Sequence, residues 1–246
     1  MTERALTVDP AEAERFRRLA DSWWDENGPL APLHKLNPPR IAFLKDNLHR
    51  YFSLGDRPAR ASLKGLSILD VGCGGGLLAE PLCRLGAEVT AIDPVHEAIR
   101  AAQAHAELGG LVIDYRATSL EALVDEGARF DVITAMEVIE HVAEPDHFVR
   151  SLSRGLKPRG CLVLSTINRT PRAFAEAIVG AEWLLGWLPR GSHSYSRLIK
   201  PSELARWCRA SGLMIERLAG MSWVADQDRF VLSKDVGVNY LAFARS

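Results

Sequence analysis

A run of glycines with an acid in front of it is the segment of this sequence best suited to hold a ligand. The run reads Asp70-Val71-Gly72-Cys73-Gly74-Gly75-Gly76 and follows a short apolar segment. Glycine lets a backbone turn sharply and lets a ligand approach without meeting a side chain. A merely tight turn is the plainer interpretation, but four glycines within five positions favour a ligand-binding loop.

The spacing around these glycines discriminates between nucleotide-like ligands. No Lys follows them, as a P-loop requires, and Leu77 stands where a G-x-G-x-x-G fingerprint needs its third glycine. The Asp70 carboxylate would repel a pyrophosphate, whereas it suits a ligand with a cationic amine and a sulfonium. Asp93 ends the next apolar segment and can accept hydrogen bonds from both ribose hydroxyls. The pattern therefore favours S-adenosylmethionine over NAD, with Asp70, Gly72, Gly74 and Asp93 as binding residues.

A second cluster of reactive side chains, Glu137, Glu140 and His141, follows another apolar segment. If the chain is helical there, these three residues project from one face. The carboxylates suit Mg²⁺, which would lower the pKa of a phenolic hydroxyl from its usual value of about 10. Alternatively, His141 acts directly as the general base, with Glu137 as its catalytic partner. A structural role in the loop is the third interpretation, and the residues alone leave all three open.

Both clusters follow short apolar segments that alternate with helical patterns from residue 66 onward. This alternation predicts βαβ units and an α/β fold, with a mostly parallel sheet and helices on both faces. Ligands bind such sheets beyond the carboxyl ends of the strands, where both clusters are expected. The expected strands cover residues 67–71, 88–92, 111–115, 130–136, 160–166, 213–218 and 239–244.

The first 60 residues predict a helical extension that precedes the sheet. Asp9 can cap a first helix, Pro10 suits its first position and Glu12 completes a capping box. A second helical pattern covers residues 41–48. The prolines before it, Pro38–Pro39, are expected to interrupt helical structure.

Composition excludes several classes of protein. The 246 residues carry 30 Lys and Arg against 31 Asp and Glu, a net charge of −1, which argues against a nucleic-acid binder. A hydrophobic fraction of 47% suffices for a real core. No apolar run is long enough to span a membrane. Four widely spaced cysteines without a Cys-x-x-Cys pair or a signal peptide predict a reduced, cytoplasmic setting.

Several motifs together carry a resemblance to a known family. Residues 66–166 resemble the core of the class I S-adenosylmethionine-dependent methyltransferases. Motifs at both ends of the chain narrow the resemblance to the ubiquinone biosynthesis O-methyltransferases, so it covers nearly the whole chain. These motifs are Trp23-Trp24-Asp25, Pro32 to Arg40, Met136 to Val142, Ser165 to Arg169, Val179 to Glu182, Ile199 to Leu204 and Val236 to Tyr240.

The resemblance implies a Rossmann-like fold and a set of cofactor contacts. The implied sheet has seven strands with the last antiparallel, an N-terminal helical extension and a helical insertion after strand five. A single domain is expected, divided into a cap (1–60), a cofactor-binding core (61–168), an amphipathic insertion or lid (169–200) and a C-terminal part (201–246). Arg40, Gly72, Asp93 and Met136 would contact the cofactor, Arg40 at its carboxylate and Met136 at the adenine edge. The resemblance also supports Mg²⁺ at the second cluster.

The implied activity is O-methylation of polyprenylated catechol or hydroxyphenol intermediates in both methylation steps of ubiquinone biosynthesis. Two alternatives stay open: another small phenolic substrate, or a non-catalytic scaffold that only binds the cofactor. The segment 172–195 has apolar residues at helical spacing and basic flanks. It predicts either a lid on the sheet or a helix that contacts anionic lipid on the inner face of the cell membrane. Other enzymes of the pathway are further expected partners.

Overall fold

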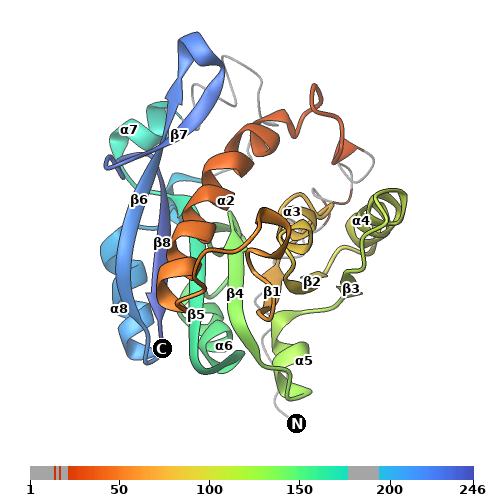
Figure 1. Ribbon diagram of the computed structural model, residues 1–246. Coiled ribbons are helices and arrows are strands. Elements are labelled where there is room, and N and C mark those ends of the chain that lie inside the picture. Colours follow the sequence, from red (N-terminus) through yellow and green to blue (C-terminus); the bar gives the residue numbers. More distant parts are fainter. Residues whose placement is uncertain (1–13, 15–16, 18–21, 177–193) are drawn as a thin grey trace.

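Short apolar segments of the sequence become the strands of one mixed sheet in the computed structural model, which describes Glu14, Arg17, residues 22–176 and residues 194–246 (Figure 1). The spatial order is β3-β2-β1-β4-β5-β8-β6-β7. The strands are β1 (Ser67–Val71), β2 (Glu88–Asp93), β3 (Asp114–Ala117), β4 (Phe130–Met136), β5 (Leu156–Ile167), β6 (Met214–Val224), β7 (Arg229–Ser233) and β8 (Asn239–Arg245). Strands β1 to β5 pair in parallel, which confirms the α/β prediction.

The sheet has eight strands among the described residues, so the prediction of seven was one short. The last strand, β8, is antiparallel to both β5 and β6, as predicted. The additional strand, β7, forms an antiparallel hairpin with the far end of β6, and this hairpin projects beyond the rest of the sheet (Figure 1). Asp228 has the left-handed conformation, φ 46°, at the hairpin turn. Asp and Asn adopt this conformation more readily than most residues, so the turn is locally specified.

Helices cover both faces of the sheet. They are α2 (Ala31–Tyr51), α3 (Ala79–Arg84), α4 (His96–Leu108), α5 (Leu120–Asp125), α6 (Pro145–Arg154), the short α7 (Pro171–Ala173) and α8 (Pro201–Ala210). Strand side chains alternate between faces, so Ile68 packs with α2, α3 and α4, while Leu69 packs with α5, α6 and α8. Both faces are therefore buried, as a parallel sheet requires.

Helix α2 differs from its prediction. Pro38 and Pro39 were expected to interrupt helical structure, but both lie inside one continuous helix. Proline removes a backbone donor and its ring crowds the preceding turn. Here the buried face of α2, which includes Phe43 and Leu44, packs on the sheet core and outweighs that cost. Tertiary packing commonly decides helix formation in this way.

Two predicted segments lie outside the described residues: the capping signal at Asp9 to Glu12, and most of the 172–195 insertion. The division of the chain into four parts stays a prediction. In the part of the chain that the structure describes, no helix combines the length and the apolar character needed to cross a bilayer.

Candidate functional site

The glycine loop, residues 72–76, follows β1 at the carboxyl edge of the sheet. Gly72, Gly74 and Gly76 have φ values of 68°, 52° and 86°, which side chains other than glycine rarely tolerate. The backbone N–H groups of Gly72 and Cys73 donate to the Ile92 carbonyl at 2.9 and 3.1 Å. The loop is therefore tied to the end of β2, where the second predicted acid lies.

The protein's own side chains fill the space beside each glycine of this loop. A Cβ atom built at any of the four would come closer than 3.0 Å to another residue. The neighbours are Val138 for Gly72, Trp23 for Gly74 and Gly75, and Tyr115 for Gly76. From the sequence alone, these glycines were explained by the close approach of a ligand. The structure shows that close internal packing demands them as well.

Asp93 holds the glycine loop through both of its carboxylate oxygens. Its Oδ2 accepts from the Gly74 N–H at 3.0 Å, and its Oδ1 accepts from the Val95 N–H at 2.8 Å. Burial raises the pKa of Asp93 to about 6, although these two hydrogen bonds oppose the shift. Each oxygen keeps a further lone pair with which to accept a ribose hydroxyl.

Asp70 lies deep at the end of β1. The Thr134 hydroxyl donates to its Oδ1 at 2.7 Å. Burial and, to a smaller extent, nearby Asp93 raise the pKa of Asp70 to about 7 against the opposing effects of Thr134 and Arg40. The carboxyl therefore titrates near neutral pH, and a cationic ligand at this edge would favour its charged form.

Arg40, from α2, forms a buried ion pair with Glu137. The Arg40 Nη2 donates to Glu137 Oε1 at 2.9 Å, and the two side chains are only 6% and 14% exposed. The Ser165 hydroxyl donates to the same carboxylate oxygen at 2.7 Å. Arg40 Nε is buried and has no hydrogen-bond partner among the described residues. This orphaned donor is the kind of group that a ligand carboxylate would satisfy.

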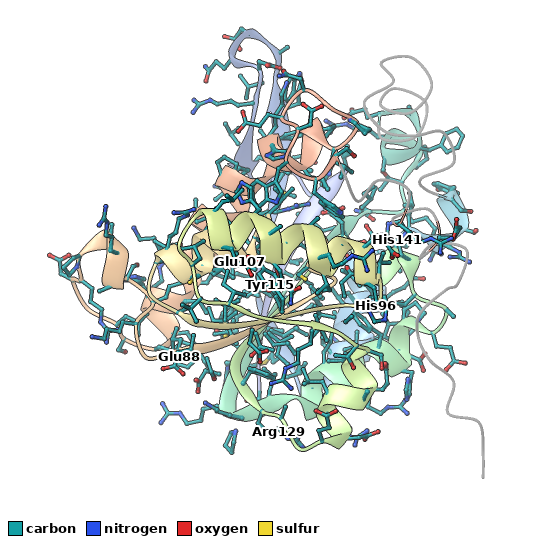
Figure 2. The ribbon with its side chains drawn as sticks, turned by 90° about the vertical axis from the view of Figure 1, so that its right-hand side faces the viewer. Glu88, His96, Glu107, Tyr115, Arg129 and His141 are labelled. Carbon is teal, nitrogen blue, oxygen red and sulfur yellow. The ribbon has the colours of Figure 1, made fainter. Side chains whose placement is uncertain are left out.

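The backbone around Glu137 is not helical, contrary to the premise of the one-face argument. Glu137 has a φ of 54°, a strained value for this residue type, and Ile139–His141 forms a single 3₁₀ turn. Glu140 is buried, and burial next to Glu137 raises the pKa of its carboxyl well above the usual range. His141 is partly buried. Figure 2 shows His141 at the same edge of the sheet as His96, which begins α4.

These three side chains do not form an ion site as they are arranged here. Within residues 22–176 and 194–246, no group of three or more His, Cys, Asp or Glu side chains is placed to hold a metal ion. The Glu137 carboxylate is instead neutralised by Arg40. Mg²⁺ binding by Glu137, Glu140 and His141 remains a prediction that this geometry does not support.

The structure brings the predicted cofactor residues to one edge. Met136 ends β4 there, partly buried against the core. Sequence reasoning missed Thr134 and Ser165, which hydrogen-bond to the predicted acids Asp70 and Glu137. Thr134 and Ser165 directly follow apolar residues of β4 and β5, and their complete burial signals a required hydrogen bond. That interruption of the apolar pattern was the available clue.

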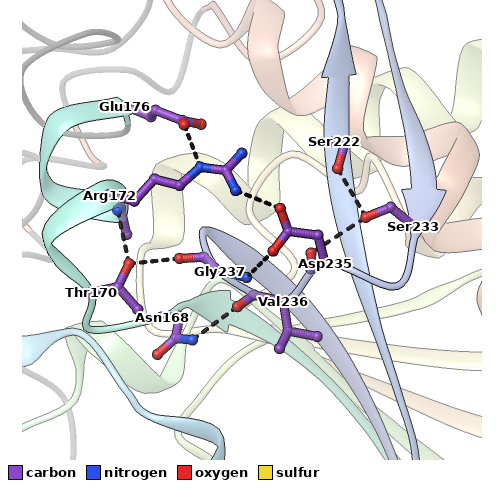
Figure 3. A network of polar contacts seen from close by, with 10 residues as sticks. Asn168, Thr170, Arg172, Glu176, Ser222, Ser233, Asp235, Val236 and Gly237 are labelled. Atoms are coloured by element: carbon purple, nitrogen blue, oxygen red, sulfur yellow. Dashed lines mark hydrogen bonds and ion pairs between the residues drawn. The ribbon is translucent and has the colours of Figure 1, made fainter.

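A separate polar network fixes the base of the insertion. We call Asn168, Thr170, Arg172, Asp235 and Gly237 the stem network (Figure 3). The Thr170 hydroxyl donates to the Gly237 carbonyl at 2.6 Å, and Arg172 pairs with Asp235. Asp235 also accepts from the Gly237 N–H at 2.9 Å, and the Asn168 amide donates to the Val236 carbonyl at 2.9 Å. The start of the insertion is thereby fastened to the β7–β8 loop.

Comparison with known proteins places this geometry in context. Residues 36–218 match the family described as "Methyltransferase domain". The ubiquinone biosynthesis O-methyltransferase of Methylobacterium nodulans is 47% identical over 97% of this chain and 95% of its own. The ubiquinone biosynthesis O-methyltransferase of Methylocella silvestris is 49% identical over 97% of this chain and 94% of its own. The solved magnesium protoporphyrin IX methyltransferase from Synechocystis, with bound S-adenosylhomocysteine, has a TM-score of 0.63 at 18% identity, covering 96% of this chain and 94% of that one. It shares the fold.

Proposed function

Because the chain belongs to the ubiquinone biosynthesis O-methyltransferase family, we propose that it methylates a hydroxyl of polyprenylated catechol or hydroxyphenol intermediates, in both O-methylation steps of that pathway. The enzyme is an S-adenosylmethionine-dependent methyltransferase. The observation that carries the proposal is the linked glycine loop and Asp93 at the carboxyl edge, next to Asp70 and Arg40. Near-full-length relatedness supports the acceptor class.

The reaction needs alignment and proton removal more than covalent help. The acceptor oxygen bonds to the methyl carbon as the sulfur leaves with the electron pair, and the hydroxyl proton goes to a base. The protein must align these three atoms and exclude water. We assign the proton to the Glu137–His141 segment, where His141 is the direct base or Glu137 accepts the proton.

Arg40 suits the methionine carboxylate of the cofactor. Its guanidinium has five N–H donors, and one nitrogen, Nη2, bonds to Glu137. The buried Nε has no partner among the described residues, so it is available for a second carboxylate. Arg40 would then link the cofactor to the segment that carries the base.

Catalysis is tested directly by methyl transfer. Purified protein, S-adenosylmethionine labelled on its methyl group and a short-chain prenyl catechol are incubated with Mg²⁺ or with a chelator. Labelled methyl ether is expected, and a catechol without the prenyl chain serves as the acceptor control. Cofactor binding without product from any prenylated catechol would favour the scaffold alternative. The described residues do not form an ion site, so no step of the proposed reaction uses Mg²⁺. Loss of methyl transfer in the chelator, with recovery on adding Mg²⁺, would support the metal prediction.

Replacing the proposed base separates chemistry from binding. Glu137→Gln and His141→Ala should each lower kcat by about a hundredfold, since a general base contributes about 10²–10⁴ in rate. The dissociation constant of S-adenosylhomocysteine should change less than about threefold, since the glutamine side chain still offers Arg40 Nη2 an acceptor oxygen. Stopped assays at saturating cofactor and calorimetry measure the two quantities. Unchanged kcat in both variants would remove this segment from the reaction.

We further propose that the insertion contacts anionic lipid, which suits a polyprenylated substrate. Phe174 and Tyr195, near the two ends of the 172–195 segment, form an exposed aromatic pair with ring centroids 5.7 Å apart. Arg172 already pairs with acids, so the lipid contact is assigned to Arg190 and Trp187, which lie outside the described residues. Co-sedimentation with anionic vesicles should fall on Arg190→Ala or Trp187→Ala and change little on Arg172→Ala. Equal sedimentation of all variants would contradict this contact.

A further inference from the structure

Two adjacent tryptophans, Trp23 and Trp24, contact the glycine loop, and neither takes part in the proposed methyl transfer. The six-membered ring of Trp23 lies over Gly74, and the five-membered part of its indole lies over Gly75. The indole N–H of Trp24 donates to the Gly75 carbonyl at 3.0 Å. The pair therefore touches the loop through packing and through a directional hydrogen bond.

Both tryptophans are themselves braced by the helices around the loop. Trp24 stacks on His105 of α4 with ring centroids 3.4 Å apart and an interplanar angle of 5°. His105 Nδ1 contacts Glu80 Oε1 of α3 at 2.6 Å, and the Glu80 side chain is buried. The Trp23 carbonyl contacts the His34 ring nitrogen of α2 at 2.8 Å. The segment before α2 is thus held against α2 and α4, and His105 in turn links α4 to Glu80 of α3.

We propose that Trp23 and Trp24 are positioning residues that hold the glycine loop in its cofactor-binding conformation. Asp93 fixes an N–H at one end of the Gly74–Gly75 pair, and Trp24 fixes the carbonyl at the other. A loop that is ordered in advance loses less entropy when a ligand binds, so its affinity is higher. The inference rests on the proposed function insofar as the cofactor lies at this loop.

Gly75 provides a probe of this packing that leaves the cofactor-binding groups in place. Its φ is not in the left-handed region that Gly72, Gly74 and Gly76 occupy, so other residues tolerate its backbone conformation. The three atoms nearest to an added Cβ all belong to Trp23. Gly75→Ala therefore tests the contact with Trp23, whose Cβ and Cγ atoms are the nearest, both at 2.4 Å, and Trp23→Gly removes these atoms and should relieve the clash.

The experiment measures cofactor affinity and kinetics in one variant set. Trp24→Phe keeps an aromatic ring at this position but removes the indole N–H. It should raise the dissociation constant of S-adenosylhomocysteine about fivefold. Gly75→Ala should raise it by a similar factor, and Trp23→Gly combined with Gly75→Ala should bind more tightly than the product of the single effects predicts, because glycine removes the Cβ and Cγ atoms that the added methyl group meets. The KM for S-adenosylmethionine should rise in parallel, with kcat and the acceptor KM unchanged. Trp207→Phe on α8 is the control and should bind as the wild type does.

The outcomes are distinguishable. If wild-type protein does not bind S-adenosylhomocysteine, both the proposed function and this inference are wrong. If the wild type binds and the Trp24 and Gly75 variants bind equally well or more tightly, only the positioning role is wrong. An acceptor KM that rises as much as the cofactor KM, or a matching loss in Trp207→Phe, would show a general structural effect and would also overturn it.

Discussion

The glycine loop and the stem network both lie beyond strand ends, yet they are held by opposite means. The loop is bound through backbone groups to a partly buried carboxylate, Asp93, and each of its glycines is packed against a side chain. The stem network joins Asn168–Arg172 to a loop more than 60 positions later, partly through an ion pair whose side chains, Arg172 and Asp235, are about half exposed. Water therefore competes strongly for the Arg172–Asp235 pair and has less access to Asp93 and the glycines packed beside it.

This difference in exposure determines how much free energy each contact contributes to stability. A buried group that loses its partner costs its full desolvation penalty. An exposed ion pair exchanges protein contacts for water at little net cost. The pKa directions agree: burial raises the pKa of Asp70, whereas the Gly237 N–H and Arg172 lower that of exposed Asp235. Substitutions at the glycine loop should therefore have large effects, and those at the stem ion pair small ones.

The largest effect is expected from Asp93→Ala. Two backbone N–H groups, of Gly74 and Val95, lose their acceptor, and the proposed ribose contact is lost as well. The unsatisfied N–H groups loosen the loop, and each ribose hydrogen bond to a charged carboxylate contributes about 1.5–3 kcal/mol, so losing both should raise the dissociation constant of S-adenosylhomocysteine at least about a hundredfold in calorimetry. Asp114→Ala removes an exposed aspartate of β3 and is the matched control. A rise of less than tenfold would show that the loop does not depend on this carboxylate.

A pH-dependent effect of intermediate size is expected from Asp70→Asn. The pKa of Asp70 is raised from 3.8 to about 7 in the folded protein, so the native state holds a proton that the unfolded chain has already released. The wild type then loses stability as pH rises from about 4 to about 7, and the asparagine variant does not, because its side chain does not titrate.

The variant should therefore gain stability relative to the wild type by about 2 kcal/mol between pH 5 and pH 8. Denaturant unfolding of the ligand-free protein at the two pH values measures the difference. Asp93, whose pKa is also raised, is present in both proteins, so its own contribution cancels except for its repulsion with Asp70, which the variant removes. A difference that is the same at both pH values would mean that Asp70 is already ionised at pH 5.

The part of the fold that the sequence predicts is the part specified locally. Strands β1, β2 and β4 and the second half of β5 are short, largely apolar runs, and the glycine loop is contiguous with the first of them. Helix α2 was predicted incorrectly at Pro38–Pro39 because the sheet that stabilises it is remote in sequence. Strand β7 was missed because its pairing with β6 supplies the regularity that its own residues do not show.

The site follows the same division. Asp70, Gly72, Gly74 and Asp93 were predicted from types and spacing, and the structure brings them together. The pair of Arg40 with Glu137 joins positions 97 apart and has no local signal. The one-face argument for Glu137, Glu140 and His141 assumed a helix, and the left-handed Glu137 backbone removes that assumption. Such a conformation is imposed by tertiary contacts, here with Ser165, rather than by local preference.

The smallest effect is expected where the comparison is sharpest, at the Arg172–Asp235 pair. Arg172→Ala and Asp235→Asn should each lower the melting temperature by no more than about 2 °C, because exposed pairs contribute little. Asparagine can still accept from the Gly237 N–H, so Asp235→Asn isolates the charge. The double variant should show almost no coupling, and 1 M salt should remove what remains. Coupling that survives in high salt would mean that the pair is shielded from water, and the contrast with the glycine loop would then fail at this contact.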